Sequence, residues 1–161
     1  MILRPATSRD STQVADVYLA SRKKFLSFAP LANSEEDVRI WISNVLIPSG
    51  NVTIAEVERQ VVGMICVSVS DGMSWIDHLY ISPDFVHQKI GSKLLLKTII
   101  NLSPPIHLNT FQQNIYAKAF YEKHGFRELS RSDGAGNEEQ CPDILYALSG
   151  ESFDSLLEKG L

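Results

Sequence analysis

The sequence predicts one mixed α/β domain. Its 161 residues suit a single domain, and 44% of them are hydrophobic, which is enough to form a core. Stretches with the helical spacing of apolar residues are interspersed with shorter apolar stretches typical of strands. Their order is strand, helix, helix, three strands, helix, strand, helix, strand, strand. Elements mixed in this way are typical of a sheet flanked by helices.

The first half of the chain is expected to hold a strand, two helices and three strands. In order, these are residues 2–5, 8–28, 34–50, 51–58, 61–70 and 74–82. The first helix ends before Pro30, and the second begins at Ser34, an N-cap residue followed by three acids that favour a helix N-terminus. Arg59–Gln60 and Asp71–Gly72 predict tight turns between the three strands, and Pro83 closes the last of them.

The second half is expected to continue with two helices, three strands and a tail. The helices and strands are residues 89–101, 106–110, 114–125, 126–130 and 144–148, and the domain is expected to span residues 1–149. In the tail, residues 150–161, three apolar residues have helical spacing; they are Phe153, Leu156 and Leu157. The tail could therefore pack on the domain, bind a partner or fray.

Composition and charge narrow the function classes. The formal net charge of −4 argues against a general nucleic-acid-binding protein. No apolar run has transmembrane length and none follows a basic start, so we expect a soluble cytoplasmic protein with no membrane partner. The two cysteines predict no disulfide framework. Cys66 is expected to be a buried small side chain, and Cys141, in a polar loop, is a weak candidate nucleophile.

The most informative stretch runs from Asn114 to Phe126 and predicts a short helix that stops at a glycine. Gly125 stands where a helix C-terminus favours a left-handed residue. Asn114, Ala117 and Tyr121 share one face over about 10 Å of rise, so they would line a slot. The residues expected to face the core instead are Tyr116 and Phe120. The alternative is an ordinary amphipathic helix whose tyrosine caps the core.

This stretch resembles motif B of the GNAT acetyltransferase superfamily, Asn-x-x-Ala-x-x-Phe-Tyr-x-x-x-Gly-Phe. The element order is similar to that family over essentially the whole chain before the tail. The resemblance implies the GNAT fold, a central mostly antiparallel sheet flanked by helices. It also implies that the slot holds acetyl-coenzyme A, with Tyr121 beside the thioester sulfur.

A second stretch, residues 77–95, is similar to motif A of the same superfamily, in which a strand leads through a loop into a helix. Unpaired N–H groups at such a helix N-terminus, together with the helix dipole, favour a diphosphate. Gly91 and Ser92 match the motif, whereas Val86 replaces a Gln or Arg and Lys89 replaces a glycine. The local cations suit the phosphates of coenzyme A; they are His87, Lys89, Lys93 and Lys97. The alternative is a solvated helix face that carries lysines.

The resemblance also implies which residues contact the cofactor. The strand before the loop is expected to splay from its neighbour, so that backbone groups at Leu79 and Ile81 bond the pantetheine arm. Asp77 is expected to share their strand parity. The expected cofactor-binding residues are Leu79, Tyr80, Ile81, Val86, His87, Gln88, Lys89, Ile90, Gly91, Ser92, Asn114, Ala117 and Tyr121.

Amide formation needs a neutral amine, and an alkylamine with a pKa of about 10.4 must first lose a proton. The candidate bases are Asp77, the nearest carboxylate, and His78, whose ordinary pKa lies near the working range. Water, Glu56 or Glu58 are alternatives. Tyr121 is the candidate acid for the leaving thiolate, because a phenol with a pKa of about 10 is protonated at neutral pH.

These motifs predict acetyl-CoA-dependent N-acetyltransfer to an amine of a small molecule or peptide, by direct attack and without a metal. The departures at Val86 and Lys89 support an alternative, a GNAT-fold acyl-CoA-binding or regulatory module without turnover. Transfer of a longer acyl group is a third hypothesis. Residues 131–143 contain four acids that could attract a cationic acceptor, or they form a plain flexible hairpin. The basic run that starts at Arg22 borders the acceptor side by resemblance, or is a solvated face. The resemblance also suggests a homodimer.

Overall fold

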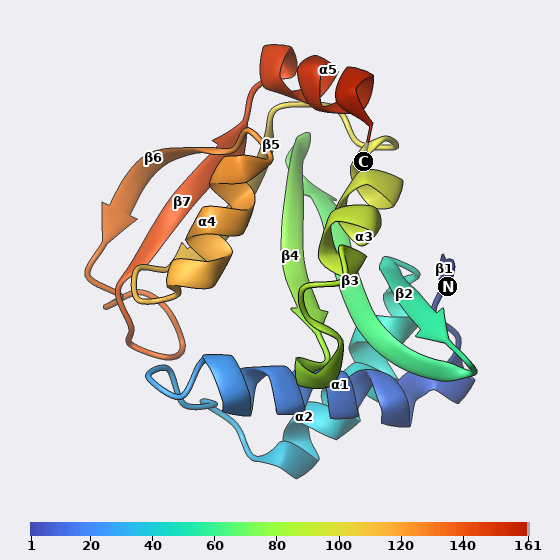
Figure 1. Cartoon of the computed structure of the whole chain (residues 1–161). Helices are drawn as coiled ribbons and strands as arrows, with labels where there is room; N and C mark the ends of the chain where they lie inside the picture. The colour runs from blue at the N-terminus through green and yellow to red at the C-terminus, as the bar shows by residue number, and fades with distance from the viewer. Residues whose placement is uncertain (161) are drawn as a thin grey trace.

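A computed structural model describes residues 1–160 and contains a seven-stranded sheet in the order β1-β2-β3-β4-β5-β7-β6 (Figure 1). The strands are β1 (Ile2–Pro5), β2 (Val52–Val57), β3 (Gln60–Ser70), β4 (Met73–Ile81), β5 (Ile106–Phe111), β6 (Arg127–Ser132) and β7 (Asp143–Leu148). The helices are α1 (Ser11–Phe25), α2 (Glu35–Trp41), α3 (Ile90–Ile99), α4 (Ile115–Lys123) and α5 (Gly150–Lys159). Only β4 and β5 are parallel neighbours among these strands, so the predicted mostly antiparallel sheet flanked by helices is confirmed.

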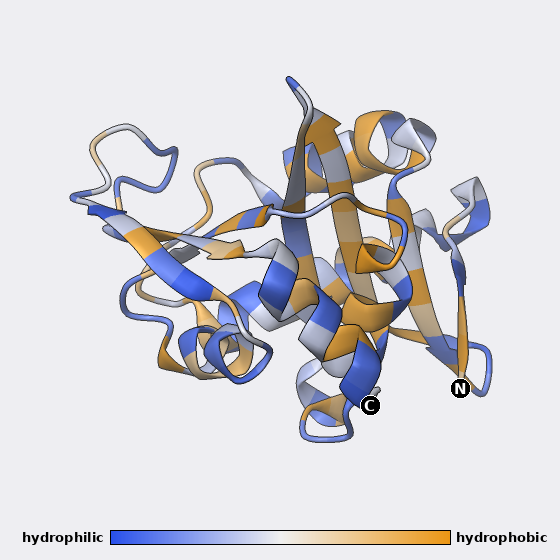
Figure 2. Ribbon diagram, turned by 90° about the horizontal axis from the view of Figure 1, so that it is seen from above, coloured by the Kyte–Doolittle hydropathy of each residue, from blue (hydrophilic) through white to orange (hydrophobic). Residues whose placement is uncertain are grey.

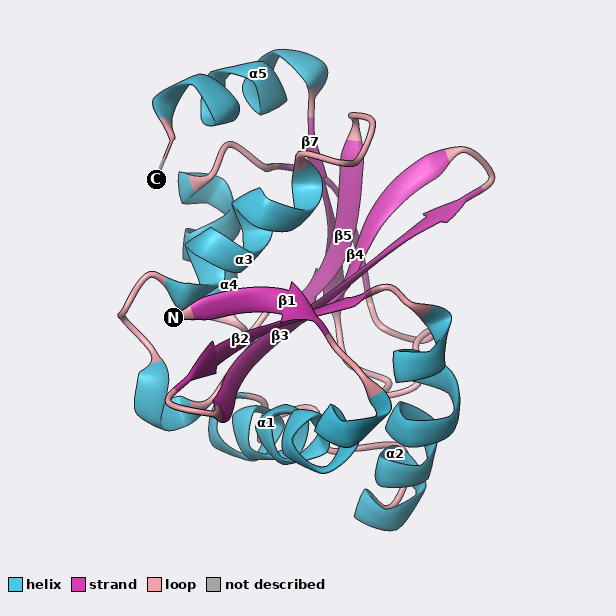
Figure 3. Cartoon of the chain, turned by 90° about the vertical axis from the view of Figure 1, so that its right-hand side faces the viewer, coloured by secondary structure: helices cyan, strands magenta, loops and turns pink. Residues whose placement is uncertain are grey.

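Helices cover both faces of the sheet, with α1 and α2 on one face and α3 and α4 on the other (Figures 1 and 3). Each face has its own apolar core. The core beneath α1 and α2 includes Val14, Ile42, Ile54 and Met64, and the core beneath α3 includes Leu94, Ile99, Ile144 and Tyr146. Figure 2 shows the apolar residues gathered along the sheet and on the helix sides that face it. We refer to these two layers as the α1 face and the α3 face.

The second helix is shorter and less regular than predicted. The α-helix ends at Trp41, and the chain continues as a π-helical turn, Ile42–Leu46, and a 3-10 turn, Ile47–Ser49. Pro48 has no N–H to donate and cannot continue the α-helical bonding pattern. Gly50 then reverses the chain with a left-handed φ of 78°.

The tail is a helix that packs on the domain. Ser149 caps α5 by accepting a hydrogen bond from the Ser152 N–H at 3.2 Å. Phe153 and Leu156 are buried in the α3-face core. Of the three alternatives for the tail, the structure shows packing on the domain for residues 150–160, and Leu161 lies outside the described residues. None of the helices described here is both long and apolar enough to cross a membrane.

Candidate active site

The sheet opens between its two central strands. β4 and β5 pair only at Ser74 with Ile106 and at Trp75 with His107. Beyond these pairs the strands diverge, while β5 remains paired with β7 on its other side (Figure 1). The rest of the β4 edge therefore has backbone groups that no strand satisfies on its β5 side, within residues 1–160. The splay implied by the resemblance is present.

A β-bulge sits on β4 where the strands part. In the register of β3 and β4, Asp77 is an extra residue between Ile76 and His78. Ile76 packs in the core of the α3 face. Asp77 lies near Cys66 and Ser68, and Cys66 belongs to the core of the α1 face. The bulge therefore turns Asp77 toward the α1 face.

The predicted parity of Asp77 with Leu79 and Ile81 is therefore wrong. Leu79 and Ile81 pack against the core of the α3 face. His78, the residue that follows Asp77, lies on the opposite face and contacts Tyr18 of α1, with 5.8 Å between the ring centroids. The physical reason is the extra residue of the bulge, which interrupts the strict alternation of a strand.

The structure separates the two candidate bases by their environments. Asp77 is exposed at the opening. Partial desolvation raises the pKa of its carboxyl, and a hydrogen bond with the Ser68 hydroxyl partly offsets this rise. His78 is packed among aromatic side chains; they are Tyr18, Trp41 and Tyr80. Burial, and secondly the charge of Arg22, lower the pKa of His78 to about 4. Asp77 is therefore the more accessible of the two candidate bases.

The two alternative carboxylates lie elsewhere. Glu56 on β2 pairs with Arg4 at 3.3 Å, and β3 separates β2 from β4. Glu58 lies in the β2–β3 turn, where it is exposed with a φ of 49°. Neither lies on the strand that borders the opening.

The loop between β4 and α3 presents a row of free backbone N–H groups. In the described chain, no protein acceptor occupies the N–H groups of residues 87–92. His87 and Lys89 both have a φ of 63°, so Lys89, which stands where motif A has a glycine, adopts a left-handed backbone. Its side chain is exposed. The loop therefore keeps the geometry of an anion site without the glycine.

Lys89→Gly is expected to be more stable than Lys89→Ala by about 1 kcal/mol, because only glycine adopts this φ without a steric cost. Both variants remove the same charge and most of the same side chain, so the comparison isolates the backbone. Urea denaturation of the two variants measures the difference. Equal stabilities would show that the left-handed conformation at this position carries no strain.

The α4 helix begins and ends as its sequence predicts. The Asn114 side-chain carbonyl accepts a hydrogen bond from the Ala117 N–H at 3.1 Å and caps the helix. Gly125, with a φ of 93°, lies just beyond its end. One of the two aromatic residues expected in the core, Phe120, packs against it. The prediction for Tyr116 is wrong, because the first turn of α4 extends past the core and leaves that ring 70% exposed.

The ring of Tyr121 is packed between aromatic side chains, whereas its hydroxyl has no hydrogen-bond partner among the described residues. The ring packs edge-on against Phe120 and Phe126, with centroids 5.2 and 5.4 Å away. The side chain is only 8% exposed. Burial, and secondly the nearby Tyr80, raise the pKa of Tyr121 well above the ordinary phenol value. The hydroxyl hydrogen-bonds no described protein group, so its proton is available for a ligand.

A family model described as "Acetyltransferase (GNAT) domain" matches residues 48–128, half of the chain. The chain belongs to the GNAT acetyltransferase family. The matched segment contains the bulge, the loop, α3 and α4, which are the parts of the site described above.

Individual relatives agree with this assignment. Peptidyl-lysine N-acetyltransferase YjaB of Salmonella typhimurium is 40% identical over 73 residues, which cover 44% of this chain and 50% of that protein. The fold is similar to the apo form of Escherichia coli YjaB, with a TM-score of 0.72, 23% identity and 91% and 97% of the two chains covered. It is also similar to the PaiA N-acetyltransferase of Thermoplasma acidophilum in complex with coenzyme A, with a TM-score of 0.70, 21% identity and 92% and 98% covered.

In this GNAT domain, a buried hydrogen bond joins α3 to α4. The Ser92 hydroxyl lies 2.9 Å from His124 Nε2, and His124 Nδ1 lies 2.6 Å from the Phe120 carbonyl. A carbonyl only accepts, so Nδ1 carries the proton, and the Ser92 hydroxyl donates to Nε2. The side chain of Ser92 is thus committed to the protein, and only its N–H is available to a ligand. The bond between Ser92 and His124 holds α3 against the end of α4, the helix that carries Tyr121.

The β6–β7 loop of the GNAT domain is an ordered structure rather than a plain flexible hairpin. The Asn137 amide donates to the Cys141 carbonyl at 2.7 Å and accepts from the Cys141 N–H at 3.1 Å. Cys141 is buried, and burial raises the pKa of its thiol, which argues against a nucleophile. From this loop Glu139 reaches Arg22 of α1 at 3.5 Å. Sequence reasoning missed the burial of Arg22, because the adjacent lysines suggested a solvated run.

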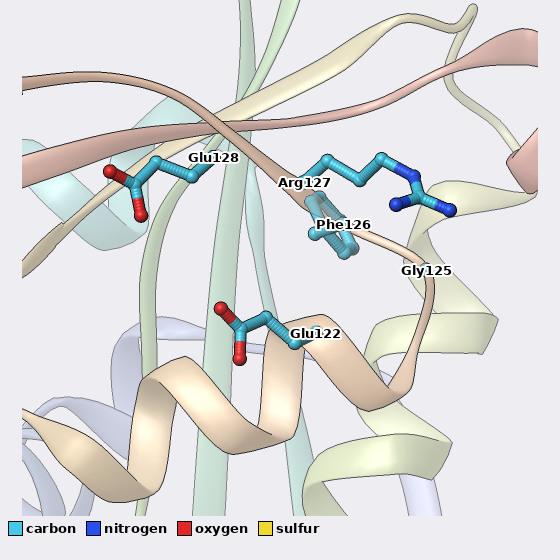
Figure 4. Close-up of a pocket in the computed structure, with 5 residues that line it drawn as sticks. All are labelled: Glu122, Gly125, Phe126, Arg127 and Glu128. Atoms are coloured by element: carbon cyan, nitrogen blue, oxygen red, sulfur yellow. The ribbon is translucent and has the colours of Figure 1, made fainter.

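A hollow of about 500 Å³ lies between the end of α4 and the start of β6 and is not part of this site (Figure 4). Glu122 and Glu128 extend into it from α4 and β6, while Arg127 points away from both. Glu122 accepts a hydrogen bond from the Tyr146 hydroxyl at 3.1 Å. Two carboxylates would repel the phosphates of coenzyme A. Within residues 1–160 no group of His, Cys, Asp or Glu side chains forms a metal-binding cluster.

Proposed function

We propose that this GNAT protein transfers the acetyl group of acetyl-CoA to an amine by direct attack. One observation carries the proposal: the free edge of β4 leads directly into the row of free N–H groups before α3, and Tyr121 lies alongside with an unused hydroxyl. An elongated ligand with an anionic end and a reactive carbonyl end would satisfy all three. Acetyl-CoA has this form.

The loop would hold the pyrophosphate. The N–H groups of residues 87–92, in the loop and the first turn of α3, have no protein acceptor, so those at the positive end of the α3 dipole would be available to an anion. The pantetheine amides would continue the sheet by bonding the β4 edge at Leu79 and Ile81. The exposed side chain of Lys89 adds positive charge near the phosphates. The backbone of Lys89 supports cofactor binding in spite of the altered motif.

Asp77 is our proposed general base. Its raised pKa makes it a stronger base than an ordinary aspartate, and its exposure at the bulge lets it take a proton directly or through one water. His78 is packed among aromatic rings, and burial lowers its pKa to about 4, so it has lost the basicity of an ordinary histidine. The departing proton would leave a neutral amine, which attacks the thioester carbonyl.

Tyr121 is our proposed donor to the leaving sulfur. Its raised pKa keeps the phenol protonated at every physiological pH. A thiolate with a pKa of about 8.5 does not fully remove a proton from such a phenol, so the main contribution is a hydrogen bond to the developing negative charge. Ala117, one turn earlier on the same helix, has the small side chain that leaves room for the ligand.

The acceptor is proposed to be an amine of a small molecule or a peptide. The relative from Salmonella is named a peptidyl-lysine N-acetyltransferase, which makes a lysine side chain a natural first acceptor to examine. The acids of the β6–β7 loop would attract a cationic amine. A binding module without turnover is the second candidate, favoured by Val86, which brings no hydrogen-bonding side chain to the loop.

Acetyl-CoA at about 100 times its dissociation constant is expected to stabilise the protein by about 2.7 kcal/mol, which is a rise in Tm of about 5–10 °C for a chain of this size. Differential scanning fluorimetry measures this rise, and adenosine, which lacks the phosphates, is the control and should cause none. Absence of a shift with both acetyl-CoA and CoA would defeat cofactor binding. A shift without thiol release across a panel of amines would favour the binding module.

A further inference from the structure

Arg22 is a buried cation whose hydrogen bonds are incomplete. The side chain is 6% exposed at the end of α1. Its Nη1 donates to the Tyr80 hydroxyl at 3.2 Å, and its Nη2 donates to the Ala29 carbonyl at 3.1 Å. Its Nε is buried and has no partner. A buried guanidinium normally has all its donors satisfied and its charge paired, so this one is prepared for a further partner.

The unfilled donor, Nε, neighbours Nη2, which makes the weakest contact of the guanidinium. Nε and Nη2 point in the same direction, and this edge binds both oxygens of a carboxylate in parallel. In the structure one oxygen of Glu139 lies 3.5 Å from Nη2. That distance is at the limit of a hydrogen bond, and Nε remains empty. The edge is therefore held loosely by a carboxylate that does not fit it.

Glu139 is not needed there to order its loop. Asn137 bonds both Cys141 and Asp143, and Gln140 donates to the Asn137 carbonyl at 2.7 Å. These bonds close the β6–β7 loop on itself. A ligand carboxylate could displace Glu139 from Arg22 while the loop keeps its shape.

Arg22 also lies beside the proposed reaction site. Its Tyr80 partner is on β4, three residues after Asp77, on the strand whose free edge borders the opening. The end of α1 and the β6–β7 loop lie side by side below the opening in Figure 1, in agreement with the Arg22–Glu139 contact. Three strand residues span about 10 Å, so a carboxylate within that distance of the reacting amine lies in the range of Arg22.

We propose that Arg22 binds a carboxylate of the acceptor in the place of Glu139, so that the preferred acceptors are amines that also carry a carboxylate. This inference rests on the proposed acetyltransfer. Arg22 lies outside the two stretches that resemble the family motifs, residues 77–95 and 114–126. The acceptor class is therefore amino acids, or peptides whose free C-terminus lies near the acetylated amine.

Matched acceptors test the proposal. Nα-acetyl-lysine and its carboxamide share one amine and differ only in the carboxylate, and alanine and alaninamide form a second pair. One of the two pairs will be the better substrate of the wild type. In that pair, kcat/KM of the acceptor that carries the carboxylate is expected to exceed kcat/KM of its amide by about 10- to 100-fold. Equal values in both pairs would overturn the proposal.

Three variants separate recognition from structure. Arg22→Lys keeps the charge but lacks the bidentate edge, so it should lose the preference while still acetylating the amides. Glu139→Gln removes the competing carboxylate and should lower KM for the carboxylates alone. Lys24→Gln, an exposed change on the same helix, should alter neither. If Arg22→Lys fails to fold, the ligand pairs in the wild type and Glu139→Gln decide the question, and no change of KM in Glu139→Gln would contradict displacement.

A binding measurement keeps this inference distinct from the proposed function. If no amine yields free CoA, the acetyltransferase proposal fails. Titration of Nα-acetyl-lysine and its amide into the CoA-saturated protein, followed by NMR, then tests Arg22 directly. The site would be supported if Nα-acetyl-lysine bound at least about tenfold more tightly than its amide and if Arg22→Lys abolished this difference. Equal binding, or no binding of either, would refute it.

Discussion

Tyr121→Phe is expected to lower kcat by about 10²- to 10³-fold, the usual contribution of one hydrogen-bond donor to the charge that develops in the transition state. The ring stays packed against Phe120 and Phe126, and no protein hydrogen bond is lost, because the hydroxyl makes none with the described residues. The acetyl-CoA-induced rise in Tm should therefore remain. Thiol release measures the turnover.

Tyr116→Phe is the matched control for this experiment. Tyr116 lies on the same helix with its ring 70% exposed, so loss of its hydroxyl should leave kcat and the cofactor-induced shift unchanged. If Tyr121→Phe turned over at the wild-type rate, Tyr121 could not be the donor. If the variant lost the thermal shift as well, the phenol would be a binding group instead.

Acid is expected to destabilise the fold by about 3 kcal/mol between pH 7 and pH 4 through His78. The unfolded histidine has a pKa of about 6.5, and burial lowers the folded value to about 4. Above pH 6.5 neither state binds the proton and this stability is fully present. As the pH falls, the unfolded state binds the proton first, so stability is lost down to the folded pKa. Urea denaturation at several pH values measures the slope.

His78→Phe isolates this contribution, because it keeps a ring among the same aromatic neighbours and removes the titration. The variant should retain only the weaker acid sensitivity of other groups. His124 also has a lowered pKa and acts in the same pH range, whereas Asp10, whose pKa is lowered mainly by Arg4, acts below its ordinary value. An identical pH dependence in the wild type and His78→Phe would contradict the lowered pKa.

Where signals are local, the sequence anticipated the structure closely. The α4 helix was predicted over residues 114–125, and the structure caps it at Asn114 and stops it before Gly125. An N-cap, helical spacing and a terminal glycine all act within a few residues of the chain. The strands were predicted within a few residues for the same reason, since their turns carry recognisable residues.

Where the outcome depended on register, the sequence was insufficient. The bulge that turns Asp77 toward the α1 face is set by how β3 aligns with β4, and no residue type marks it. Likewise Lys89 holds a left-handed backbone because the segments on either side of it are anchored in β4 and α3. From its residue type alone, Lys89 counted only as a departure from the motif.

The sequence by itself determined the order of elements and the family, together with the helix that carries Tyr121. Those features follow from spacing and from residues that neighbour one another along the chain. The tertiary structure alone decided that Asp77 and His78 lie in different electrostatic environments, that Ser92 is tied to His124, and that Arg22 is buried with an empty donor. Burial and partners determine what a polar group can do, and both come from segments distant in the sequence.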